Sequence, residues 1–235
     1  MTARADVCFV VEGSYPYVTG GVASWVHQLV TNMPEVRFAL LTLLPDEQSS
    51  RVDKYEVPAN VVARQDVFLF GEAQDPGLRR EAPRALIEGL EALHAAPQTG
   101  RCPYFKTVEA AWRASRQTSA TMMTARSSWR LLQRLYESRE RRVSFLDYFW
   151  TWRAIHGPMF RLFDVDLPDA AVYHPVSTGY AGFVAALAKQ RLGAGMVLTE
   201  HGLYTREREI EIASAEWIYR EPAEGTAFAP YEPFF

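Results

Sequence analysis

The N-terminal part of the chain alternates short apolar runs with a glycine-rich loop, and this order constrains the fold more than any other feature. Residues 7–12 are nearly all apolar, which is typical of a strand buried on both faces of a parallel sheet. Gly13 ends this run, and Gly20 and Gly21 precede a segment whose apolar residues fall on one helical stripe. A second apolar run covers residues 36–44. Strand, loop, helix and strand in this order form a βαβ unit, which predicts a parallel sheet covered by helices.

The same alternation returns later in the chain. A third apolar run lies within residues 61–70, and residues 170–173 and 196–199 are predicted to form two further buried strands. The alanine-rich residues 180–191 are predicted to form a helix that ends at Gly193. The chain is therefore predicted to be an α/β protein with a Rossmann-like, doubly wound parallel sheet.

Residues from about 83 to about 163 differ from the rest, because Ala, Leu, Arg and Glu dominate there and β-branched pairs are rare. Apolar residues recur at helical spacing, which predicts a helical insertion of three or four helices. Tyr148, Phe149, Trp150 and Trp152 are interpreted mainly as residues that pack this insertion. The alternative is that one of these aromatic rings stacks against a carbohydrate.

Charge and cysteine content exclude several classes of protein. The 25 Lys and Arg residues nearly balance the 28 Asp and Glu residues, so we expect no nucleic-acid partner. Cys8 and Cys102 are too few and too far apart for a disulfide scaffold, and Cys8 is predicted to be a small buried hydrophobic residue. The first residues resemble no export signal, and no apolar run reaches the ~18 residues that cross a bilayer. These features predict a cytoplasmic protein.

Three predicted loops share the carboxyl edge of the sheet, where open α/β sheets bind their ligands. They cover residues 13–21, 174–179 and 200–208. In the first loop, Gly20 and Gly21 at a helix N-terminus would let backbone N–H groups approach a phosphate; the alternative is a glycine turn that only fits the chain geometry. The spacing does not match G-x-G-x-x-G, which disfavours a nicotinamide enzyme, and no GK[ST] follows, which disfavours a P-loop.

Two histidines follow predicted strands at the same edge. His201 lies beside Gly202 and is positioned to donate a hydrogen bond to a sugar hydroxyl or a phosphate oxygen. His174 has the same place after its own strand, and for both residues a structural role is the alternative. Arg206, in a charged run after His201, is a candidate for pairing with a diphosphate, although such runs are usually solvated edges. No metal-binding pattern is present, and no metal or resident cofactor is expected.

Two stretches of the sequence resemble a known family. VCFVVEGSYPYVTGGVASWVHQLV resembles the first strand, glycine loop and helix of glycosyltransferase family 4, and VLTEHGLYTREREIEI resembles the signature of its PelF-type members. The resemblance implies the N-terminal domain of a GT-B fold and a retaining transferase that uses a UDP-sugar to build the Pel-type exopolysaccharide of biofilms. It implies that Gly20 and Gly21 face the donor diphosphate and that His201, the candidate catalytic residue, contacts the donor sugar. It also places Tyr15, Tyr17 and His174 near the growing polysaccharide acceptor.

The resemblance also implies a second, nucleotide-binding GT-B domain after residue 235, so we expect residues 1–235 alone to be inactive. The proline-rich residues 222–235 end on two phenylalanines, which suggests a truncation before a following helix. Inner-membrane polysaccharide synthase components are expected partners, which would hold the protein at the inner face of the cytoplasmic membrane. Two alternatives stay open: a non-catalytic docking module of a synthase complex, and a sugar-nucleotide epimerase on a GT-B-like scaffold.

Overall fold

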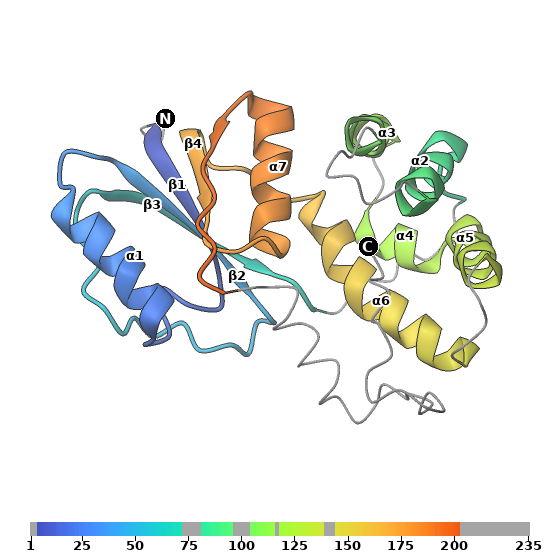
Figure 1. Cartoon of the computed structure of the whole chain (residues 1–235), viewed down its shortest axis with the longest axis horizontal. Helices are drawn as coiled ribbons and strands as arrows, with labels where there is room; N and C mark the ends of the chain where they lie inside the picture. The colour runs from blue at the N-terminus through green and yellow to red at the C-terminus, as the bar shows by residue number, and fades with distance from the viewer. Residues whose placement is uncertain (1–3, 72–80, 96–103, 116–117, 139–143, 203–235) are drawn as a thin grey trace, which may run out of the picture. The chain divides into compact units, whose positions relative to one another are not determined.

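The computed structural model describes residues 4–71, 81–95, 104–115, 118–138 and 144–202 (Figure 1). These residues belong to two compact units. The first, called the sheet unit below, contains the described residues up to Gly71 and those from Arg161 onward. The second, the helical unit, contains the described residues from Glu81 to Phe160.

The sheet unit is built on five parallel strands in the order β3-β2-β1-β4-β5. Because β1 lies in the middle, Phe9 has Leu40 of β2 on one side and His174 of β4 on the other. This arrangement confirms the predicted α/β class with a parallel, Rossmann-like sheet. The strands are β1 (Ala5–Glu12), β2 (Phe38–Leu44), β3 (Val61–Phe68), β4 (Ala170–Pro175) and β5 (Gly195–Met196).

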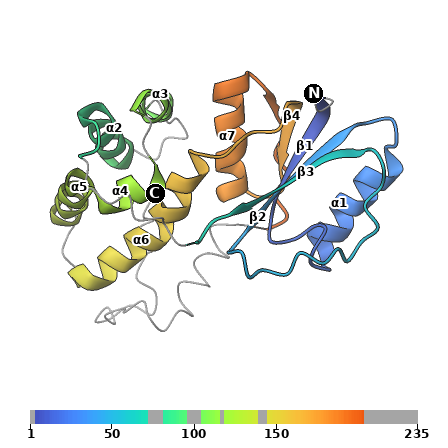
Figure 2. The same ribbon diagram turned by 180° about the vertical axis from the view of Figure 1, so that it is seen from behind.

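Helices α1 (Gly21–Asn32) and α7 (Tyr180–Leu192) lie on opposite faces of the sheet (Figures 1 and 2). Alternate residues of a strand point to opposite faces. Phe9 and Val11 therefore pack with the buried face of α1, whereas Cys8 and Val10 are fully buried on the other face. The buried position of Cys8 confirms its predicted role, and burial raises the pKa of its thiol. Helix α7 ends as predicted at Gly193, whose φ of 66° favours glycine.

The last strand differs from its prediction. Residues 196–199 were expected to form a buried strand, but β5 is only two residues long and Met196, Val197 and Leu198 are exposed. The chain nevertheless stays beside β4, because the amide of Val197 donates to Tyr173 and that of Thr199 donates to Pro175. β5 is an edge strand, so apolar residues there do not acquire the burial that the same residues have in β1.

The helical unit has five described helices rather than the predicted three or four. Two of these helices follow one another directly and are separated by Ala125, whose backbone is extended. Thr118 caps the first of these two by accepting a hydrogen bond from the amide of Thr121. Apolar side chains such as Val108, Trp112 and Leu131 form the core of the unit. Its helices are α2 (Arg84–Ala95), α3 (Phe105–Ser115), α4 (Ser119–Thr124), α5 (Arg126–Glu137) and α6 (Phe145–Leu162), the last two residues of α6 belonging to the sheet unit.

Candidate functional site

The candidate site lies at the carboxyl edge of the sheet, where the chain leaves β1 and β4. From β1 the chain continues through α1 to β2 on one side, while β4 lies on the other side of β1. This reversal of strand order is a topological switch point, the place where doubly wound sheets bind ligands. The loops after β1, β4 and β5 all begin at this edge because the strands are parallel.

Helix α1 presents an open N-terminus at this edge. Gly20, its N-cap residue, is exposed, has an extended backbone and makes no side-chain capping bond. A Cβ atom added at Gly20 or Gly21 would meet no atom of the described residues within 4 Å, apart from the neighbouring backbone. The first N–H groups of a helix have no intrahelical partners and carry the positive end of its dipole. The geometry therefore suits an anion.

Three rings gather beside that helix. Trp25 of α1 is half-buried, and its ring centroid lies 5.7 Å from that of His174 and 4.7 Å from that of His201. His174 Nε2 is 2.7 Å from Thr199 Oγ1. Burial, and then the nearby His201, lower the pKa of His174, which favours the neutral imidazole at neutral pH. His201 is an exposed residue among those that the structure describes.

A different arrangement closes the N-terminus of α7. The Glu12 carboxylate, at the end of β1, accepts hydrogen bonds of 2.7 Å from the Ser177 hydroxyl and from the backbone amide of Ala181. A carboxylate in this position offsets the positive end of the helix dipole. Glu12 thus acts as a cap from a distant part of the chain, and α7 offers no comparable place for a soluble anion.

Replacing Glu12 with alanine is expected to lower the free energy of unfolding by about 1–3 kcal/mol, because a charged acceptor of two hydrogen bonds is lost. Glu12→Gln keeps an acceptor but removes the charge, so a smaller loss is expected. Chemical denaturation of both variants measures the effect, and Ser177→Ala serves as the control that removes one hydrogen bond only. An Ala variant as stable as the parent would contradict the capping role.

The two tyrosines proposed to lie near the acceptor have different surroundings. Tyr15 is fully buried in the core under α1, with its hydroxyl 3.4 Å from His27 Nδ1, and burial raises its pKa to about 12. Tyr17 is also buried, and its hydroxyl donates to Asp66 and accepts from Arg64 at 3.3 Å. The structure therefore does not bring Tyr15 or Tyr17 into the ring cluster of Trp25, His174 and His201.

Some residues of this edge were not predicted as functional. Trp25 is one of the apolar residues whose spacing predicted the helix after Gly21, and neither it nor Glu12 or Thr199 was given a functional role. Their signal in the sequence is weak, because each acts through a partner on another segment: His201, Ala181 and His174 respectively. Arg206, the predicted diphosphate partner, lies outside the described residues.

Within the described part of the chain, no three His, Cys, Asp or Glu side chains are grouped so as to hold a metal ion. Among the helices of that same part, none combines the length and the apolar character needed to cross a bilayer.

The fold defines a Rossmann-like α/β protein, and the switch point of its sheet is a candidate site for an anion. The chain belongs to the family described as Domain of unknown function (DUF3492), whose model matches residues 5–231. Comparisons with curated proteins and with solved structures gave no match.

Proposed function

We propose that this chain is the acceptor-side, N-terminal domain of a retaining, UDP-sugar-dependent glycosyltransferase that acts in Pel-type exopolysaccharide synthesis. The observation that carries the proposal is the uncapped N-terminus of α1 beside an exposed histidine at the switch point. The stretch that resembles glycosyltransferase family 4 contains Gly20 and Gly21, and the stretch that resembles its PelF-type members contains His201. The family match over residues 5–231 and the parallel sheet are compatible with this assignment.

In the proposed reaction, the bond between the sugar and the diphosphate of the donor breaks, and UDP leaves with the bonding electrons. An acceptor hydroxyl forms the new glycosidic bond on the same face of the sugar, and its proton passes to the departing diphosphate. The N–H groups at the start of α1 would stabilise the negative charge that develops on this leaving group. His201 would donate a hydrogen bond to the donor sugar.

A second nucleotide-binding domain of the same protein would complete the cleft, and the resemblance supports this proposal. Transfer would then require the complete protein, because a site with one wall neither excludes water nor holds both substrates. We propose that the protein acts in the cytoplasm, where UDP-sugars are available. We also propose that a membrane synthase that accepts the growing polysaccharide is its partner.

Gly21→Asp in the complete protein is expected to weaken UDP-sugar binding by about tenfold or more, because its carboxylate would repel the donor diphosphate. Folding should be unaffected, since an added Cβ meets no atom of the described part of the chain within 4 Å and an acidic residue suits the first turn of a helix. Gly21→Ala is the matched control, and it should retain affinity. Calorimetric titration with UDP and UDP-sugars measures both. Equal affinities of the Asp and Ala variants for the UDP-sugar would contradict the proposal that the donor diphosphate binds at the N-terminus of α1.

A docking module is the second candidate, and one observation favours it. Leu146 and Trp150 lie one turn apart on α6, and both are more than half exposed, at 62% and 51%. Exposed apolar pairs of this kind occur at interaction surfaces. If the complete protein binds no nucleotide, this candidate replaces the transferase.

An epimerase, the third possibility, would convert the nucleotide sugar without releasing free UDP, so product analysis separates it from a transferase.

A further inference from the structure

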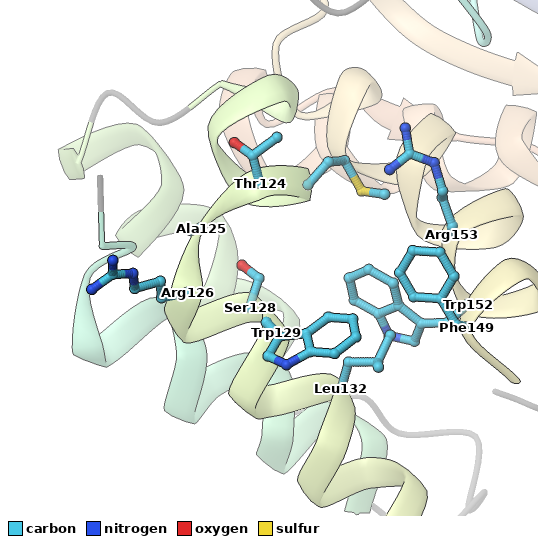
Figure 3. A pocket seen from close by; sticks show the side chains of 10 residues that line it. Thr124, Ala125, Arg126, Ser128, Trp129, Leu132, Phe149, Trp152 and Arg153 are labelled. Carbon is cyan, nitrogen blue, oxygen red and sulfur yellow. The ribbon is translucent and has the colours of Figure 1, made fainter. Parts of the chain in front are cut away.

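The helical unit contains a pocket of about 380 Å³, within the size range of small-ligand sites. It lies among the C-terminal end of α4, the first turns of α5 and the middle of α6 (Figure 3). All the lining residues belong to this one unit, so the pocket is separate from the candidate site at the sheet edge. Its lining consists of Met123, Thr124, Ala125, Arg126, Ser128, Trp129, Leu132, Phe149, Trp152 and Arg153.

Two buried polar atoms of the lining have no hydrogen-bond partner among the described residues. They are the hydroxyl of Ser128, which is 4% exposed, and the indole nitrogen of Trp152, which is 6% exposed. A buried polar group without a partner is costly, and most such groups in folded proteins are paired. They belong to different walls, one to α5 and the other to α6. A ligand with several separated oxygens would satisfy both.

The polar groups of the lining are mainly donors. The indole N–H of Trp152 and the guanidinium of Arg153 only donate, and no Asp or Glu is present among the lining residues. In addition, α5 begins at this wall with Ala125 as its N-cap residue and without a side-chain capping bond. Arg126 extends away from the aromatic rings in Figure 3, and Arg153 is the other positively charged residue of the lining. The lining therefore favours a ligand with acceptor oxygens and a negative charge.

Aromatic rings complete the lining. Trp129, which is 45% exposed, and Phe149 have ring centroids 5.9 Å apart, and both gather near Trp152 in Figure 3. Their faces suit the apolar C–H surface of a sugar ring. A flat aromatic acid would also pack there, but with its oxygens at one end it would not reach donors on two walls. A sugar carries oxygens around its whole ring.

From these observations we propose that the helical unit binds an acidic saccharide in this pocket, with the ring against Trp129 and Phe149 and the acidic group near Arg153 and the start of α5. Ser128 and Trp152 would hydrogen-bond ring or hydroxyl oxygens. This site goes beyond the proposed transfer reaction, because none of its residues belongs to the sheet edge.

The test measures binding of glucuronate, glucose 6-phosphate and glucose to the complete protein by saturation-transfer NMR and calorimetry. Glucuronate carries a carboxylate and glucose 6-phosphate carries a phosphate, so the acid that binds more tightly identifies the preferred acidic group. At least one of the two acids should bind about tenfold or more tightly than glucose, since only the acids can pair with a positive charge. Equal affinity for glucose, or no binding of either acid, would overturn the proposal.

Variants separate this pocket from the rest of the surface. Trp129→Ala and Arg153→Gln should each weaken binding of the acidic sugar by about tenfold, whereas Trp150→Ala and Arg130→Gln, on the same two helices but outside the lining, should not change it. Ser128→Ala should weaken binding while leaving the protein as stable as before or more stable, because it removes an unpaired buried hydroxyl. Gly21→Asp should leave this binding intact. Equal losses in Trp129→Ala and Trp150→Ala would contradict the site.

Discussion

Acidification below about pH 6.5 is expected to destabilise the helical unit by about 1.4 kcal/mol per pH unit. The cause is His156, a fully buried side chain whose pKa is lowered to about 3 by burial and, secondarily, by the nearby His94. Its Nδ1 lies 2.8 Å from the carbonyl oxygen of Trp152, which only accepts, so this nitrogen carries the proton of the neutral ring. Nε2 then accepts from His94 Nε2 at 3.0 Å, and protonation of His156 would break that bond.

The sign follows from the lowered pKa. An unfolded chain protonates this histidine near its ordinary value of 6.5, whereas the folded unit resists protonation down to about 3. The unfolded state therefore binds more protons between these values, so stability decreases as the pH is lowered through that window. Above pH 6.5 both states are neutral, and this contribution no longer varies with pH.

Denaturant titrations followed by tryptophan fluorescence suit this measurement, because Trp112, Trp129, Trp150 and Trp152 all lie in the helical unit. His156→Gln should remove most of the slope between pH 6.5 and pH 4, because a glutamine does not titrate there. His27→Gln, in the sheet unit, is the matched control and should retain the slope. An unchanged slope in His156→Gln would show that other groups cause the acid sensitivity.

Phe9→Ala is expected to cost about 3–5 kcal/mol of stability, as for other fully buried phenylalanines. The Phe9 ring is 1% exposed in the central strand and lies against three rings: Trp25, Phe38 and His174. Its loss would leave a cavity directly beneath the candidate site. The expected fall in melting temperature is about 6–20 °C for a domain of this size.

Calorimetry or thermal circular dichroism measures this change, and Phe9→Leu is the matched control with a much smaller expected loss. Nucleotide affinity of the complete protein should fall as well, because His174 and Trp25 lose their support. A change of less than about 1 kcal/mol in Phe9→Ala would show that the core closes around the cavity.

The framework of the sheet unit was predictable because its apolar runs are buried on both faces. Residues 38–44 are all buried in β2, and α1 begins at Gly21, where the two consecutive glycines predicted the start of a helix. The same reasoning was wrong for residues 196–199, because apolar character indicates burial only where neighbouring elements cover both faces. The predicted number of helices in the insertion was too low, since a single extended residue such as Ala125 hardly changes a helical pattern.

The candidate site was only partly predictable. Strand ends and glycines place Gly20, His174 and His201 at one edge, since parallel strands end on the same side. The contact of His174 with Thr199, and of Trp25 with His201, depends on side-chain directions that the spacing of residues does not encode. Tyr15 and Tyr17 illustrate the same limit, because both are near the glycine loop in sequence yet buried in the fold.

Because Glu12 caps α7, the N-termini of the two helices at this edge are expected to differ in their affinity for dissolved anions. Helix α7 already has a carboxylate as an internal ligand, whereas the start of α1 faces solvent. Phosphate or sulfate in a buffer is therefore expected to compete with the proposed nucleotide ligand at α1 and not at α7, which would lower the affinity measured in such a buffer. Nucleotide titrations in a buffer without these oxyanions, repeated with added phosphate, would give the inhibition constant of phosphate. Because α7 is already capped, this constant would describe the start of α1.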